Sequence, residues 1–319
     1  MRKLLLLGLL AGGVAYAADD DARRCDLAGA EAYDPMRPAG VPFRYFHPLY
    51  ADTATMKADV EACQRAFAAG KDPRYSFQAG NILRDFLQEK SLRRMTAAES
   101  PAAAGQLADK GMEQLALGAY RAAADAGYHP ARAVLASMAA LQPDSPATLF
   151  DDVLKDAPAA GHAGLAQWYE RQMLLAPERK AQWQAQAKQH WQAALDAGNA
   201  AARLGLARIL ADEGDMAQAR TLLQQADAQD LYALDALALF YFKTGETAAG
   251  EQILAGVQQR ADAGNADARV FADYWRGLRL LNGWGMAHDE AAAIAALQAA
   301  ARGGHQQAQF TLMGMKQPW

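Results

Sequence analysis

The chain has 319 residues, of which 52% are hydrophobic and 21% charged, and its formal net charge is −4 at pH 7. This composition is too apolar for a disordered chain, and the absence of a basic excess argues against a nucleic-acid-binding protein. Alanine supplies 77 residues, whereas valine and isoleucine together supply 11. Because alanine is the best helix former and β-branched residues favour strands, we expect an all-α fold.

The first 17 residues have the pattern of an export signal. Arg2 and Lys3 precede the apolar run 4–10, and a small-x-small sequence ends at Ala17. The run is too short to cross a bilayer as a helix, which takes about 20 residues. We therefore expect a signal peptide at 1–17, cleavage after Ala17, and a periplasmic mature protein without a membrane span. An uncleaved membrane anchor is the alternative.

Cys25 and Cys63 are the two cysteines of the chain. In an oxidising compartment we expect them to form a disulfide that ties the N-terminal segment to the first helix. Closing a loop of this length stabilises a fold by about 3–4 kcal/mol in the chain-entropy model. The alternative is a reactive thiol, for which the nearby Arg23, Arg24 and Arg65 would supply positive charge.

Residues 18–55 are predicted to be irregular. Four prolines interrupt this segment, which excludes one continuous helix, and four aromatic residues crowd into positions 43–50. In an exported protein such a cluster of aromatic rings must be shielded from water. We expect it to pack as a cap on the first helices of the domain that follows. An exposed binding arm is the alternative.

A repeated pattern runs through residues 56–315, which we expect to form one helical domain. A small-residue helix end is followed by glycine and, four residues later, by alanine. Full copies occupy 124–131, 195–202, 261–268 and 301–308, and weaker copies centre on Gly70, Gly161 and Gln229. After a first step of 57, the centres lie 31–40 residues apart, close to the roughly 35 residues that two helices and two turns need. Glycine ends a helix readily because it adopts the left-handed conformation without strain.

The last full copy carries the clearest resemblance to a known family. It comprises Ala268, the turn 281–285, Asp289, Ala292, Leu297, Ala300, Ala301 and Gly304. With this pattern the chain resembles the Sel1-like repeat proteins, relatives of the tetratricopeptide class, over about residues 60–315. The resemblance implies a right-handed α-solenoid of helix-hairpin repeats whose concave side binds another protein. Repeat number and phase stay open at 85–120 and 140–180, because most other copies lack the Gly-x-Gly turn.

No reaction motif stands out. None of the six histidines is paired with another at i, i+4 spacing, there is no His-Glu-x-x-His sequence, and no Gly-x-Ser-x-Gly sequence occurs. His129, His162 and His305 lie at or just after repeat turns, where we expect them to cap helices. We therefore expect no enzyme, no cofactor and no metal.

Long aromatic and arginine side chains on the first helices of the hairpins are the candidates for contacting a partner. They are Trp168, Arg171, Arg208, Phe240, Tyr274, Trp275 and Arg279. The alternative is that the aromatic residues pack between helices, because a solenoid helix is covered on two sides.

The sequence thus predicts an exported solenoid that binds a protein, does not bind nucleic acid and performs no chemistry. Short exported chains of this family resemble the immunity proteins that protect bacteria from type VI secretion phospholipase effectors. That resemblance implies an inhibitor that neutralises a secreted toxin by covering it. An adaptor in an envelope assembly, such as polysaccharide export or secretion, and a cell-envelope hydrolase are the alternatives.

Overall fold

The computed structural model describes residues 19–34, 36–47, 50, 52–97, 103–140 and 145–319. All regular elements in these ranges are helices, and none of the residues described is in a strand. The expected all-α fold is therefore confirmed. None of the helices in these ranges combines the length and the apolarity needed to span a membrane. The expected signal peptide at 1–17 lies outside the described residues.

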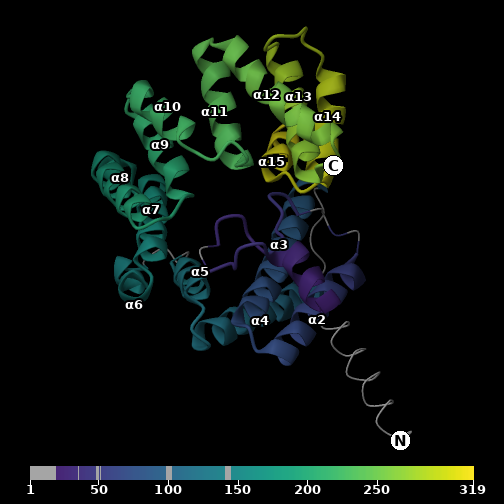
Figure 1. Cartoon of the computed structure of the whole chain (residues 1–319), viewed down its shortest axis with the longest axis vertical. Helices are drawn as coiled ribbons and strands as arrows, with labels where there is room; N and C mark the ends of the chain where they lie inside the picture. Colours follow the sequence, from purple (N-terminus) through teal and green to yellow (C-terminus); the bar gives the residue numbers. More distant parts are fainter. Residues whose placement is uncertain (1–18, 35, 48–49, 51, 98–102, 141–144) are drawn as a thin grey trace, which may run out of the picture. The chain divides into compact units, whose positions relative to one another are not determined.

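The chain forms two compact units rather than the single domain expected over 56–315 (Figure 1). Of the described residues, the first unit contains those within 1–44, 50–94 and 99–135, and the second contains those within 45–49, 95–98 and 136–319. The division falls inside a helix, α5 (His129–Ala139). Because that helix continues through the division, a sequence pattern of helices and turns gives no sign of it.

The first unit holds the long helices α2 (Thr53–Gly70), α3 (Pro73–Ala97) and α4 (Ala103–Asp125). The Asp52 carboxylate caps the start of α2 by accepting from the backbone N–H of Thr55 at 2.7 Å. Residues 19–29 are also helical, which corrects the expectation that 18–55 is wholly irregular. This helix is stabilised by its contacts with the rest of the unit, which sequence propensity does not report.

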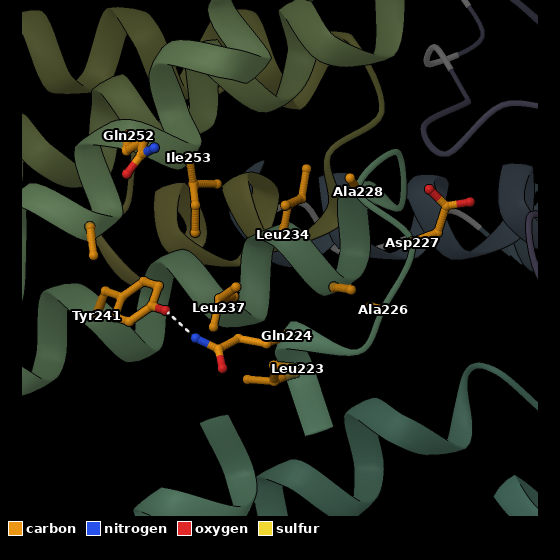
Figure 2. Close-up of a pocket in the computed structure, with 12 residues that line it drawn as sticks. Leu223, Gln224, Ala226, Asp227, Ala228, Leu234, Leu237, Tyr241, Gln252 and Ile253 are labelled. Atoms are coloured by element: carbon orange, nitrogen blue, oxygen red, sulfur yellow. Dashed lines mark hydrogen bonds between the residues drawn. The ribbon is translucent and has the colours of Figure 1, made fainter. Parts of the chain in front are cut away.

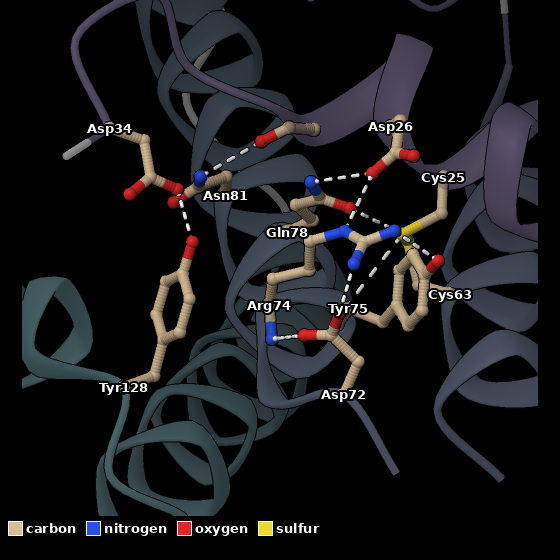
Figure 3. A network of polar contacts seen from close by, with 11 residues as sticks. Cys25, Asp26, Asp34, Cys63, Asp72, Arg74, Tyr75, Gln78, Asn81 and Tyr128 are labelled. Atoms are coloured by element: carbon tan, nitrogen blue, oxygen red, sulfur yellow. Dashed lines mark hydrogen bonds and ion pairs between the residues drawn. A yellow bond between two sulfur atoms is a disulfide. The ribbon is translucent and has the colours of Figure 1, made fainter. Parts of the chain in front are cut away.

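The disulfide between Cys25 and Cys63 forms as expected and joins the helical segment 19–29 to α2 (Figure 3). A buried polar network surrounds it. Asp26 accepts from the Gln78 amide at 3.0 Å and pairs with the Arg74 guanidinium at 3.2 Å. The Asn81 amide donates to the carbonyl of Gly29 at 2.9 Å. Because these buried groups have partners, the network favours one docking position for the segment.

The second unit is a series of helices in which each packs on the next. They are α6 (Asp151–Asp156), α7 (Pro158–Leu175), α8 (Lys180–Asp196), α9 (Ala202–Asp212), α10 (Met216–Gln224), α11 (Leu231–Thr244), α12 (Thr247–Asp262), α13 (Ala266–Asn282), α14 (Glu290–Arg302) and α15 (Gln306–Gly314). The 3₁₀ turns Ala147–Phe150 and Pro177–Arg179 precede α6 and α8. Contacts also join α9 to α11 and α11 to α13. Such neighbour-on-neighbour packing of helical hairpins is the arrangement of an α-solenoid.

The turns between hairpins follow the sequence pattern. Gly198, Gly264 and Gly304 have φ values of 93°, 94° and 95° and so take the left-handed conformation. The turn before α11, where the sequence has Gln229, is closed differently. There the Asp227 carboxylate accepts from the backbone N–H of Gln229 at 2.8 Å. An aspartate turn thus replaces the glycine turn.

Close helix contacts make one glycine of α9 irreplaceable. A Cβ atom on Gly205 would lie 2.3 Å from the indole ring of Trp191, whereas one on Gly256 of α12 would meet nothing within 4 Å. We expect Gly205→Ala to lower the free energy of unfolding by about 2 kcal/mol through overpacking. Gly256→Ala is expected to raise it by about 0.5–1 kcal/mol. Urea unfolding followed by tryptophan fluorescence measures both, and a destabilised Gly256→Ala protein would contradict this packing.

Only part of the aromatic segment packs on the first helices. The Tyr50 ring meets Phe86 of α3 edge-on and its hydroxyl donates to Asp59 of α2 at 3.0 Å, whereas the described residues 45–47 belong to the second unit. The Phe46 side chain is 6% exposed and lies in a core cluster with Phe271, Trp275 and Leu312 of α13 and α15. Sequence reasoning placed the segment on its nearest neighbours along the chain, but the Tyr45 and Phe46 rings pack on the distant helices α11, α13 and α15.

Candidate partner-binding surface

Two of the predicted partner-binding residues, Trp168 and Arg171, lie one turn apart on α7 and are half-buried. The Trp168 indole N–H donates to the carbonyl of Ser145 at 3.2 Å, and the Arg171 guanidinium donates to the carbonyl of Ala140 at 2.8 Å. The Trp168 ring also meets Trp183 of α8 edge-on, with centroids 6.1 Å apart. The polar atoms of Trp168 and Arg171 therefore bind neighbouring backbone carbonyls. The rings of Trp168 and Trp183 form an aromatic contact between α7 and α8.

The end of α7 exposes two large apolar side chains. Leu174 is 82% exposed and Leu175 is 56% exposed, and they lie one to two helical turns beyond Trp168. In the 3₁₀ turn just before α8, the Arg179 guanidinium lies 4.1 Å from the centre of the Trp183 ring of α8. We call the surface formed by Trp168, Arg171, Leu174, Leu175 and Trp183 the α7 edge. Adjacent exposed leucines on a helix that also carries a half-buried tryptophan are typical of protein-binding surfaces.

Arg208 of α9 is exposed and forms an ion pair with Glu170 of α7. Glu170 also accepts from the indole N–H of Trp191 at 2.6 Å. One carboxylate thus joins the helices α7, α8 and α9. An exposed ion pair of this kind adds little stability, and the Arg208 side chain stays 52% exposed while it is paired with Glu170.

The other predicted partner-binding residues lie inside the second unit. Phe240, Tyr274 and Trp275 are buried in its core clusters, so they are core residues and not surface anchors. The Arg279 side chain is 17% exposed, pairs with Glu251 at 2.6 Å and donates to the carbonyl of Trp284 at 2.9 Å. These side chains are buried because both faces of α11 and α13 are covered by other parts of the unit. This is the alternative stated above, in which the aromatic residues pack between helices.

Asp235 is a functional candidate that sequence reasoning missed. Its carboxylate accepts from the indole N–H of Trp275 at 2.8 Å across the contact between α11 and α13. Burial raises the pKa of Asp235 to about 6, and the Trp275 hydrogen bond opposes this rise. A carboxylate with a raised pKa in a protein interior is typical of functional sites, although it also occurs in structural networks. No motif links Asp235 to Trp275, because they are 40 residues apart.

A pair of histidines was also missed. His162 of α7 and His190 of α8 approach with their Nδ1 atoms 3.0 Å apart, and the His190 ring stacks on Tyr169. Burial and the neighbouring His162 lower the pKa of His190. One imidazole donates to the other in this contact. Among the described residues, no group of three or more histidine, cysteine, aspartate or glutamate side chains is placed to hold a metal ion.

His305, by contrast, caps α15 as the sequence predicted. Its Nδ1 atom accepts from the backbone N–H of Ala308. Burial lowers the pKa of His305 to about 3, so the ring stays neutral and acts as an acceptor at physiological pH.

A cavity of about 330 Å³ opens between α10, α11 and α12 (Figure 2). Its walls are mostly alanine, leucine and isoleucine, and the Gln224 amide donates to the Tyr241 hydroxyl at 2.9 Å on its lining. Helix α10 has 9 residues, whereas its counterparts α8 and α12 have 17 and 16. The cavity lies where this second helix of a hairpin ends early, at Gln224.

Comparison with known proteins gives little further evidence. No family model matches the chain, and no curated protein matches it. Among solved structures, a Sel1 repeat protein from Oxalobacter formigenes is 19% identical over 96% of this chain and 90% of that chain, with a TM-score of 0.33. It belongs to the family that the repeat pattern resembles. The helical hairpins of this chain are defined by the contacts between its own helices.

Proposed function

We propose that the protein is a non-catalytic scaffold whose second unit binds another protein at the α7 edge. The observation that carries this proposal is the pair of adjacent exposed leucines, Leu174 and Leu175, at the end of α7. Single exposed apolar residues are ordinary, but two large neighbours of 82% and 56% exposure at the end of one helix form a patch of the kind that protein partners cover. Trp168, which meets Trp183 of α8 edge-on, lies one to two turns earlier on the same helix, and aromatic residues of this kind are typical interface anchors.

The charge of the second unit favours a basic partner. Residues 136–319 contain 20 acidic and 15 basic side chains. Long-range attraction to a basic surface speeds association at low ionic strength and weakens with salt. We therefore expect the association rate to fall as salt is added, while the apolar contact of the leucines keeps the dissociation rate nearly constant.

We further propose that the partner is an exported enzyme that this protein inhibits, as an immunity protein does with a type VI phospholipase toxin. The Cys25–Cys63 disulfide supports a location in an oxidising compartment. The export signal expected at 1–17 supports the periplasm. A preformed stack of helices loses little conformational entropy on binding, which suits tight one-to-one inhibition.

The test begins with capture of the partner on the mature protein in periplasmic extract, followed by reconstitution from purified components. Because large apolar anchors dominate interface energies, we expect Leu174→Glu with Leu175→Glu to weaken binding at least 100-fold in calorimetry. Leu115→Glu is the matched control, since Leu115 is 62% exposed in the first unit. Equal binding by both variants would overturn the assignment of the α7 edge.

Enzyme assays of the purified partner distinguish an inhibitor from a scaffold that binds its partner without inhibiting it. Loss of the partner's hydrolytic activity on adding one equivalent of this protein supports the inhibitor. A captured partner that is a subunit of an export or secretion complex, with no activity to inhibit, would overturn the inhibitor and leave a scaffold.

A further inference from the structure

Two histidines of the second unit face each other where α7 packs on α8 (Figure 1). The Nδ1 atom of His162 lies 3.0 Å from the Nδ1 atom of His190, and the centres of the two rings are 5.2 Å apart. His162 lies beyond the first turn of α7, whose start has no side-chain cap, so it does not cap this helix as the sequence predicted. We call these two residues the histidine pair.

Aromatic neighbours restrict the orientation of the histidine pair. The His190 ring stacks on Tyr169 with ring centres 5.4 Å apart and an angle of 15° between the ring planes. Tyr169 in turn packs against Trp183 of α8 at 5.7 Å. Both histidines are half-buried, so they are held by their neighbours without being sealed from solvent. A site built on packed helices and supported by further side chains is more precise than one on loops.

The spacing of the two rings matches that of two ligands on one tetrahedral zinc ion. With Zn–N bonds of about 2.0–2.1 Å, two imidazoles on such an ion have nitrogen atoms roughly 3.3 Å apart and ring centres roughly 5.2 Å apart. The histidine pair has this separation of ring centres. A tilt of the rings that widens the distance between the Nδ1 atoms by about 0.3 Å therefore aims both nitrogens at one point. Neighbouring ligands of a square-planar copper ion would have ring centres only roughly 4.5 Å apart.

Binding of the ion changes the tautomer of one histidine and not its charge. Without the ion, one imidazole donates from Nδ1 to Nδ1 of the other. Zinc takes the place of the shared proton, which moves through solvent to Nε2 of the ring that carried it. Both rings are then neutral and bind zinc through the lone pair of Nδ1.

The histidine pair supplies two of the four ligands of a tetrahedral ion. In the part of the chain that the structure describes, no third histidine, cysteine or carboxylate completes the set. Water therefore takes the other two positions. Structural zinc sites have four protein ligands and supply folding energy outright. A site with two is weaker, so we expect zinc to bind reversibly to a chain that folds without it.

We propose that His162 and His190 form a reversible zinc-binding site that joins α7 to α8. These helices carry the α7 edge, so an ion held between them fixes the two elements on which that surface is built. The inference goes beyond the proposed partner binding and does not depend on it, because the ion binds to the chain alone. Sequence spacing gives no sign of the site, since the histidines are 28 residues apart and lie on different helices.

Zinc binding is measured on the full chain without a histidine tag, after a chelator has removed bound metal. We expect calorimetry with zinc chloride to show one ion per chain. The thermal midpoint followed by tryptophan fluorescence is expected to rise by about 3–6 °C at a zinc concentration about ten times the dissociation constant. Magnesium chloride is expected to leave the midpoint unchanged, because magnesium takes oxygen ligands.

Asparagine variants distinguish a metal site from a pair that is only hydrogen-bonded. The asparagine amide places a polar atom close to the position of Nδ1, so His162→Asn and His190→Asn retain a hydrogen bond between the helices but lose a zinc ligand. We expect both variants to keep native circular dichroism and to show no rise of the midpoint with zinc. His288→Ala is the matched control, since His288 is an exposed histidine of the same unit. It is expected to respond to zinc like the unchanged protein.

Imidazole ¹⁵N spectra of the unchanged protein give a measurement that needs no variant. Zinc is expected to shift the Nδ1 resonances of two histidines, and these resonances are expected to be absent in the asparagine variants. No zinc binding by the unchanged protein, or a rise of the midpoint that persists in both asparagine variants, would overturn the site. Neither result bears on capture at the α7 edge, so failure here and failure of the proposed function are distinguishable.

Discussion

Replacing Asp235 by asparagine is expected to stabilise the second unit by about 2–3 kcal/mol at pH 7 and to have almost no effect near pH 4. The folded chain holds Asp235 at a pKa of about 6, against an ordinary value of 3.8. Between these pH values the folded state binds more protons than the unfolded state, so stability falls as pH rises through the window. Above pH 6 the cost of the buried charge is constant. Asparagine removes that charge and keeps an oxygen that accepts from Trp275.

Urea unfolding monitored by tryptophan fluorescence at several pH values measures this effect. Asp262→Asn is the matched control, because its exposed carboxylate accepts a hydrogen bond at 2.8 Å from Gln258 in the same helix. We expect it to change stability by less than about 0.5 kcal/mol at any pH. A stabilisation by Asp235→Asn that is equal at pH 4 and pH 7 would show that burial does not raise the pKa of this carboxylate.

Removing the disulfide with Cys25→Ala and Cys63→Ala is expected to destabilise the first unit by about 3–4 kcal/mol. The bond closes a loop of 38 residues, and opening it returns chain entropy to the unfolded state. The helix at 19–29 depends on this link and on the polar network beneath it. We expect the variant to lose helical signal at lower temperature than the unchanged protein.

The positions of the tryptophans make the measurement selective. All six lie between 168 and 319, in the second unit, so fluorescence reports that unit while circular dichroism reports both. We expect the dichroism midpoint to fall and the fluorescence midpoint to stay. Arg65→Ala is the matched control, since it breaks an exposed ion pair to Asp21 at 2.8 Å between the same two segments and is expected to cost under about 1 kcal/mol. A parallel fall in both midpoints would show that the bond stabilises more than the first unit.

The features that the sequence predicted well are local ones. Glycines at 198, 264 and 304 mark helix ends because the left-handed backbone there has one favoured residue type. His305 was recognised as a cap from its place after a turn. Cys25 and Cys63 had no competitors for pairing. Each of these predictions needs only neighbouring residues or a single possible partner.

The features that the sequence did not predict depend on packing between distant segments. Phe46 lies against His305, and nothing within either neighbourhood of the sequence indicates the other. Tyr274 and Trp275 were expected at the surface, but a helix covered on two sides leaves few positions for exposed rings. Asp235 of α11 accepts a hydrogen bond from Trp275 of α13. The apolar periodicity of the sequence marks Asp235 only as an ordinary polar position.

The aspartate turn before α11 has a consequence for ancestry. The same bend is closed by a glycine backbone at 127, 198, 264 and 304 and by the Asp227 side chain before α11. Because a glycine backbone and an aspartate side chain both close the bend, selection for the bend does not preserve the residue type at the turn. A hairpin array can therefore drift until its repeats are unrecognisable in linear comparison, while each helix still meets the one that follows.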